Sequence, residues 1–102
     1  MSYQKYIPVL KALSDETRMQ IVDMLTGGEL CACNILEEFD ITQPTLSYHM
    51  NVLTKSGLVC ARRDGAWMHY SLNGALGREL SEFFSHLATE NMKNSACSAC
   101  SK

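Results

Sequence analysis

The chain has 102 residues, of which 46% are hydrophobic and 20% charged, and its formal net charge is −2. This length predicts a single domain and is too short for most two-domain enzymes. No apolar run approaches the roughly 20 residues that a membrane-spanning helix needs. The first eleven residues lack the pattern of a signal peptide, so we expect a cytoplasmic protein.

The negative net charge argues weakly against nucleic acid as a partner, but the charges are unevenly distributed. Between residues 43 and 70, three cationic side chains are set against one acidic side chain, Asp64. The acidic clusters lie elsewhere in the sequence. We therefore expect one mildly basic face on a protein that is acidic as a whole.

Helical periodicity predicts four helices in the first half of the chain. The first spans residues 3–13, and the second begins after Ser14 as N-cap and ends at Gly27 and Gly28. A third, short helix is expected over residues 31–39. The fourth begins after Thr42 and ends at Gly57, and its apolar residues predict a buried face: Leu46, Met50 and Leu53.

The pattern then changes from helical to alternating. Two strand-like runs, residues 58–63 and 66–72, flank Asp64 and Gly65, a pair of residues typical of a β-hairpin turn. Trp67 is expected in the core under this hairpin. Apolar residues from Leu76 onwards predict a last helix of about five turns. The order predicts a mainly α winged helix-turn-helix with about five helices and two strands.

The chain contains five cysteines: Cys31, Cys33, Cys60, Cys97 and Cys100. In the cytosol such cysteines are more often metal ligands or redox centres than structural disulfides. Side chains two residues apart point in nearly opposite directions within a helix. Cys31 and Cys33 are expected at a helix start, where both sulfurs could converge on a soft ion and where the thiol pKa is lowered. Two small buried hydrophobes are the alternative interpretation.

Several motifs occur in an order that is typical of one family. They are ALSDETR (residues 12–18), ELCAC (29–33), TQPTLSYHM (42–50), GLV (57–59) and RDGAWMHY (63–70). Over roughly residues 6–73 the chain resembles the ArsR/SmtB metal-responsive repressors, and most of all the arsenical-resistance repressors. The resemblance implies a homodimer built on the first and last helices, which releases double-stranded operator DNA when a thiophilic ion binds. Residues 1–93 would form this DNA-binding and dimerisation domain, and residues 94–102 a flexible cysteine-containing tail.

The inducing ion follows from the ligands available. Trivalent arsenic or antimony accepts three thiolates, but Leu36 stands where arsenical repressors often carry a further cysteine. Cys60 is expected to point inward from a strand, so a tail cysteine, Cys97 or Cys100, is favoured as the third ligand; a tail with idle thiols is the alternative. Both tail cysteines together with Cys31 and Cys33 would make four ligands, so cadmium, lead or zinc is an alternative inducer.

A second metal site of the resembled family uses carboxylates and histidine on the last helix. His86 and Glu90 share one face there, but no matching acidic residue and histidine lie upstream, so we expect a solvated pair. No obligatory cofactor is expected.

The expected DNA contacts lie on the fourth helix and the hairpin. The helix start would meet base edges, and the cations would meet phosphates. The full set is Gln43, Thr45, Ser47, Tyr48, His49, Lys55, Arg62 and Arg63. In the resembled family the Tyr48 position is often arginine, so the operator sequence is expected to differ. Ordinary surface is the alternative for Tyr48 and His49.

Two other functions fit parts of the pattern. A redox sensor of the same fold would form a disulfide at Cys31 or Cys33. A small enzyme with a cysteine nucleophile, such as an arsenate reductase, would need an anion-binding loop, and none accompanies the cysteines. We therefore expect a repressor and not an enzyme.

Overall fold

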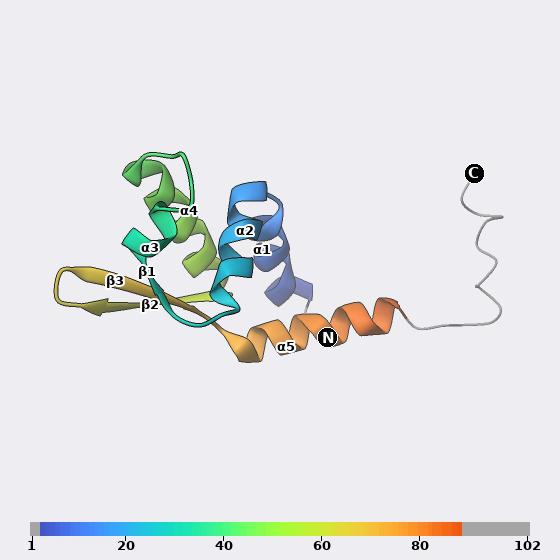
Figure 1. Ribbon diagram of the computed structural model, residues 1–102. Coiled ribbons are helices and arrows are strands. Elements are labelled where there is room, and N and C mark those ends of the chain that lie inside the picture. Colours follow the sequence, from blue (N-terminus) through green and yellow to red (C-terminus); the bar gives the residue numbers. More distant parts are fainter. Residues whose placement is uncertain (1–2, 89–102) are drawn as a thin grey trace, which may run out of the picture.

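The computed structural model describes residues 3–88. In chain order its elements are α1 (Tyr3–Leu13), α2 (Glu16–Leu25), β1 (Leu30–Cys31), α3 (Ala32–Leu36), α4 (Gln43–Ser56), β2 (Val59–Asp64), β3 (Trp67–Leu72) and α5 (Gly74–Leu87). Figure 1 shows α1 to α4 gathered together, with the β2–β3 hairpin projecting at one end and α5 at the other. The predicted winged helix-turn-helix is confirmed.

The wing is a three-stranded antiparallel sheet in the order β1-β3-β2. The strand β1 was not predicted because two residues are too few to show an alternating pattern. The turn also lies one residue later than predicted. Asp64 pairs with Trp67, so Gly65 and Ala66 form the turn, and Gly65 has a φ of 65°, which glycine adopts without strain.

The helix ends follow local capping rules with two corrections. The short helix predicted over residues 31–39 is α3, which ends at Leu36, three residues earlier than predicted. Asp15, and not Ser14, is the N-cap of α2: its Oδ2 accepts the Arg18 backbone N–H at 3.0 Å. The Ser14 hydroxyl instead donates to the Leu10 carbonyl, at the end of α1. Thr42 caps α4 as predicted.

Two apolar clusters hold the chain together. The larger one joins α2, α3, α4 and the sheet, and it contains the predicted buried face of α4, Leu46, Met50 and Leu53. The smaller one joins α1 to α5 and includes the fully buried Val9. Between them they fix α4 and the hairpin relative to each other.

The helix α5 is described over 14 residues, close to four turns against about five predicted. An ion pair between Lys5 and Glu79, at 2.7 Å, joins it to α1. Among residues 3–88, no helix is both long and apolar enough to cross a membrane. The predicted tail, with Cys97 and Cys100, lies outside the described residues.

Candidate functional site

The paired thiols lie where the wing sheet meets α3. Cys31 ends β1 and is the N-cap of α3: its sulfur accepts the Asn34 backbone N–H at 3.4 Å. Cys33 follows in the first turn and is exposed, which argues against a purely apolar role. Both cysteines therefore lie at the start of a helix, as predicted, and the convergence of their sulfurs on one ion stays a prediction.

The two thiols differ in acidity. A hydrogen bond from the Cys33 thiol, followed by the Asn34 N–H, lowers the pKa of Cys31 below its ordinary value. The same hydrogen bond keeps the proton on Cys33 and raises the pKa of that thiol. Cys31 is therefore the first of the two to become a thiolate, the form that attacks and binds soft ions.

The described residues of one chain bring no third ligand to this pair. Within residues 3–88, no group of three or more Cys, His, Asp or Glu side chains could hold a metal. The prediction that Cys60 points inward is wrong, because Cys60 is exposed. Cys60 pairs with Ser71 and Cys31 with His69, so a whole strand and a two-residue offset separate them. Ordinary sheet spacing puts their Cα atoms about 12 Å apart.

The remaining metal-ligand predictions stay untested. Cys97, Cys100 and Glu90 lie outside the described residues, and His86 is exposed near the end of α5. Leu36, which stands where the resembled arsenical repressors often carry a further cysteine, is half-buried one turn after Cys33.

The thiol site is tied directly to the wing. His69 of β3 pairs with Cys31 on one side and with Arg62 of β2 on the other, so these three residues form one row across the sheet. Glu29, two residues before Cys31, binds the Arg62 guanidinium through two hydrogen bonds of 2.8 and 3.1 Å. Cys31 and Arg62 are therefore linked both through the paired strands and through Glu29.

The start of α4 presents polar side chains to solvent. Gln43, Thr45, Ser47 and Tyr48 are all exposed, as a base-reading surface requires. Lys55 is also exposed, but it lies in the last turn, about 18 Å along the helix axis from Gln43.

His49 was predicted on this surface, and the structure places it inside. Only 9% of it is exposed, because it completes the i, i+3, i+4, i+7 stripe with the three buried apolar residues of α4. Its Nδ1 lies 3.1 Å from Nη1 of Arg18 and 4.0 Å from Oδ2 of Asp15. The stripe was a signal available in the sequence.

Arg18 is a positioning residue that sequence reasoning missed. Its Nε donates to the Ala12 carbonyl at 2.7 Å, and its guanidinium lies 6.0 Å from the Tyr48 ring centre. Together with the His49 contact, this one side chain joins α1 and α2 to the start of α4. No spacing rule could have found it, because its partner His49 is 31 residues away.

The wing cations differ in their surroundings. Arg62 is held by Glu29 and lies 3.9 Å from Asp64. Arg63 alternates to the opposite sheet face, shared with Met68 and Tyr70, and its charge acts on Tyr70.

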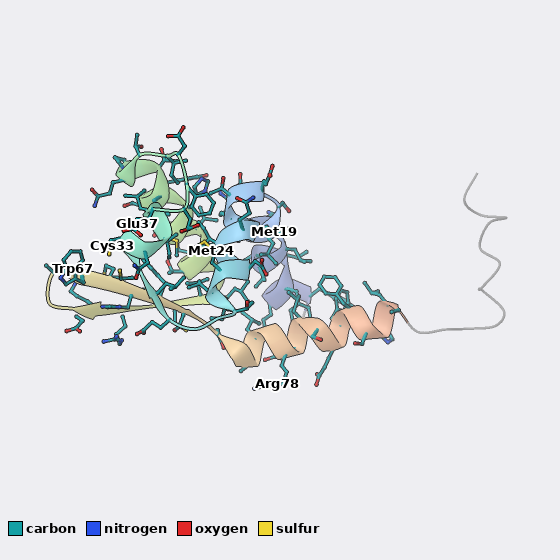
Figure 2. All side chains as sticks on the ribbon, viewed as in Figure 1. Met19, Met24, Cys33, Glu37, Trp67 and Arg78 are labelled. Carbon is teal, nitrogen blue, oxygen red and sulfur yellow. The ribbon has the colours of Figure 1, made fainter. Side chains whose placement is uncertain are left out.

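The prediction that Trp67 is a core residue is wrong, since 58% of it is exposed near the hairpin tip (Figure 2). Trp67 pairs with Asp64, the last residue of β2, and thus lies next to the turn of the hairpin.

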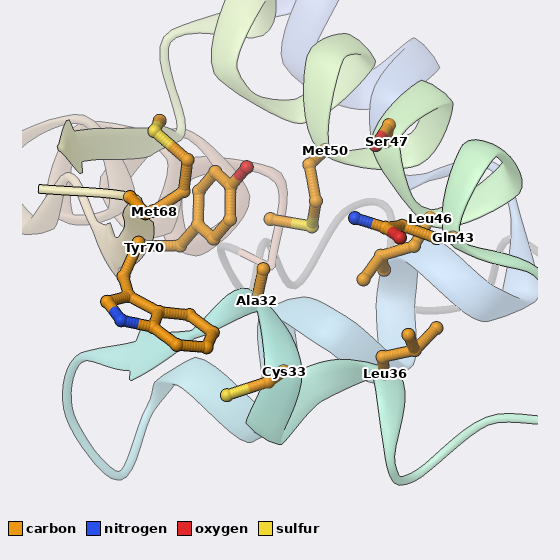
Figure 3. Close-up of a pocket in the computed structure, with 11 residues that line it drawn as sticks. Ala32, Cys33, Leu36, Gln43, Leu46, Ser47, Met50, Met68 and Tyr70 are labelled. Carbon is orange, nitrogen blue, oxygen red and sulfur yellow. The ribbon is translucent and has the colours of Figure 1, made fainter.

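A crevice of about 370 Å³ lies between α3, α4 and the hairpin (Figure 3). It is lined by Ala32, Cys33, Leu36, Gln43, Leu46, Ser47, Met50, Ala66, Trp67, Met68 and Tyr70. One of the paired thiols, the start of α4 and the tip of the wing thus border one space.

Known proteins share this arrangement. A model of bacterial regulatory proteins of the arsR family matches residues 15–60. The arsenical resistance operon repressor of Staphylococcus aureus is 44% identical over 97 residues, which cover 95% of this chain and 90% of that protein. The chain belongs to the arsR family. Membership in this family and the winged helix fold make it a DNA-binding transcriptional regulator, a class of protein that is not enzymatic.

Other arsR-family members give the same result. The arsenical resistance operon repressor of Staphylococcus xylosus is 49% identical over 73 residues, covering 72% of this chain and 70% of that protein. A crystal structure of a possible transcriptional regulator for arsenical resistance superimposes with a TM-score of 0.71 at 29% identity, covering 83% and 88% of the two chains. The homodimeric winged helix-turn-helix domain of a possible ArsR-family regulator from Mycobacterium bovis superimposes with a TM-score of 0.68 at 30% identity. The superposition covers 83% of this chain and 79% of that chain.

Proposed function

We propose that this arsR-family regulator is a cytoplasmic repressor that binds operator DNA as a homodimer and leaves it when trivalent arsenic or antimony binds Cys31 and Cys33. The relatives named as arsenical resistance repressors support the class of inducer. The observation that carries the proposal is the placement of two free thiols, Cys31 and Cys33, at the junction of the wing sheet and α3.

The outer faces of α1 and α5 support the homodimer. Tyr3 and Ile7 on α1, and Phe84 and Leu87 on α5, are large apolar side chains between 45% and 69% exposed. Apolar surface of this kind on adjoining helices is typical of a contact with a second copy. Phe84→Glu should therefore shift the protein toward monomer in sedimentation, whereas Glu82→Gln, an exposed change on the same helix, should not.

The exposed start of α4 supports the operator contact. Each protomer offers one such helix, so a homodimer would contact an inverted repeat with half-sites about one or two helical turns apart, at ~34–36 Å per turn. Gln43 can contact adenine, and Ser47 and Thr45 can reach bases or phosphates.

The ligand chemistry supports a site completed by the tail. Arsenic in arsenite forms three As–S bonds, and each bond releases one water from a hydroxyl of arsenic and a thiol proton. Cys31 and Cys33 supply two sulfurs, and Cys60 is too far along the sheet to supply the third. We assign the third sulfur to Cys97 or Cys100.

The sheet supports the coupling between inducer and operator. An ion lowers DNA affinity only by binding the free and the DNA-bound protein differently, typically by ~1–3 kcal/mol. Because Cys31 and Arg62 belong to one row of the sheet, ligation at Cys31 is transmitted to the wing through paired strands.

A gel shift on the DNA upstream of its own gene tests the proposal. Arsenite should release the wild-type protein, whereas Cys31→Ser and Cys33→Ser should bind the DNA equally well and stay bound. Serine keeps a capping oxygen at residue 31, so the fold is preserved. Cys60→Ser is the matched control and should respond normally. Normal release of either of the first two variants would contradict the assignment.

The same assay separates the alternatives. A regulator of the cadmium, lead or zinc type would be released by those ions and not by arsenite. The exposed Cys33 beside the more acidic Cys31 would also suit a redox sensor, which peroxide would release.

A further inference from the structure

Tyr48 differs from the other exposed residues at the start of α4 because it is aromatic. Among the described residues of this helix it is the large aromatic side chain in solvent, with 60% of it exposed. Tyrosine rings are enriched in binding surfaces, because one ring buries a large apolar area and loses little side-chain freedom. The ring is therefore a candidate contact residue in its own right.

The position of Tyr48 on the helix directs it away from the protein. Successive residues of an α-helix are turned by about 100° around its axis. Tyr48 thus lies about 150° around α4 from the middle of the buried stripe, compared with about 70° to 110° for the other three exposed residues at the helix start. With α4 in the major groove, Tyr48 would be the one of these four that reaches furthest toward the bases.

The ring of Tyr48 is braced from the protein side. The guanidinium carbon of Arg18 lies 6.0 Å from the ring centre, and the His49 ring lies 5.4 Å away, centre to centre, tilted by 56°. Both neighbours are fixed, because Arg18 Nε donates to the Ala12 carbonyl at 2.7 Å and Arg18 Nη1 lies 3.1 Å from Nδ1 of the buried His49. A braced ring loses little conformational entropy on binding, which favours a direct contact.

The base edges determine what such a ring can contact. In the major groove they present hydrogen-bond donors and acceptors and one apolar group, the C5-methyl of thymine. A ring that enters the groove displaces water, and the methyl is the group that it can cover without leaving a base donor or acceptor unpaired. Resting on the proposed operator contact of α4, we infer that Tyr48 packs its ring on the C5-methyl of one thymine in each half-site and so determines the operator sequence at that position.

Deoxyuridine tests the inference, because it pairs with adenine as thymine does and lacks only the methyl. Each thymine of the operator upstream of the gene is replaced in turn, at the same position of both half-sites, and affinity is measured by fluorescence anisotropy. At one position the full-length wild-type protein should lose about fourfold in affinity per half-site, and so about fifteenfold per homodimer, because the methyl is no longer there to be buried.

Three variants assign that loss to the ring. Tyr48→Ala should bind the thymine and deoxyuridine duplexes equally at this position, whereas Tyr48→Phe, which keeps the ring, should show the wild-type ratio. Lys55→Ala is the matched control, since Lys55 lies on the same exposed face of α4 about two turns later. Its loss should weaken binding to both duplexes and leave their ratio unchanged.

The outcomes separate this inference from the proposed function. If the wild-type protein binds the operator and no deoxyuridine substitution changes the affinity, or if the loss persists in Tyr48→Ala, the inference is overturned and the operator contact stands. A Tyr48→Phe variant without the discrimination would assign it to the hydroxyl and would also overturn the ring contact. If the wild-type protein does not bind the DNA upstream of its own gene, the proposed function fails and the inference fails with it.

Discussion

We predict that Arg63, rather than Arg62, is the wing cation that contacts a DNA phosphate. It shares a sheet face with Met68 and Tyr70, which border the crevice next to α4, whereas Glu29 holds Arg62 on the other face. In the part of the chain that the structure describes, no carboxylate pairs with Arg63. We predict that Arg63→Ala weakens operator binding more than Arg62→Ala does, because Arg62 must leave its ion pair before it contacts phosphate.

The expected loss of operator affinity in the Arg63→Ala variant can be estimated from counterion release. Each neutralised phosphate contributes about 0.9 to the slope of log affinity against log salt. A homodimer loses two such contacts in the Arg63→Ala variant, so its slope should flatten by about 1.8. The ratio of wild-type to variant affinity should then be about twelvefold larger at 50 mM than at 200 mM salt.

Fluorescence anisotropy of a labelled operator duplex, titrated with protein at salt concentrations between about 50 and 200 mM, measures both the salt slope and the affinity ratio. Glu29→Gln is the companion variant: it frees Arg62 and should steepen the slope. An unchanged slope in the Arg63→Ala variant would remove this side chain from the DNA contact.

Three further predictions concern the tail, the thiols and the core. Truncation after Asn94 should weaken the arsenite response but not DNA binding, and X-ray absorption should count fewer than three sulfurs around arsenic; an unchanged count would exclude the tail. Cys33→Ala removes the hydrogen bond that lowers the pKa of Cys31, so that pKa rises, and alkylation of Cys31 by iodoacetamide should slow at neutral pH but not at high pH; equal rates at neutral pH would show that Cys33 has no such effect. Leu53→Ala, at a fully buried site, should lower the free energy of unfolding by about 2–5 kcal/mol in urea titrations, against less than about 0.5 for exposed Asn51→Ala.

The helices of this chain were predictable because several local signals agree. Around α4, a capping threonine, a stripe of apolar residues and a C-terminal glycine, Gly57, all indicate the same 14-residue helix. The position of Cys31 at a helix start was equally accessible, since it depends only on neighbouring residues.

The errors arise where a distant contact decides the outcome. Whether Trp67 or Cys60 is buried depends on how far the helices extend over the hairpin, which no local pattern records. The strand β1 exists only because Leu30 and Cys31 meet the edge of β3. His49 is a different case: the stripe that it completes on α4 was a local signal, and the distant contact with Arg18 only satisfies its ring nitrogen.

One sulfur atom in this regulator serves two purposes. Cys31 Sγ is a proposed ligand and also the N-cap of α3, a helix of five residues that is too short to be stable alone. A good N-cap is worth about 1 kcal/mol, which is comparable to the free energy that couples many effectors to their targets. A ligand that draws this sulfur away from the Asn34 N–H uncaps α3 directly. We predict that the fold then needs no hinge to respond, because loosening this single helical turn disturbs the apolar cluster that α3 shares with α4.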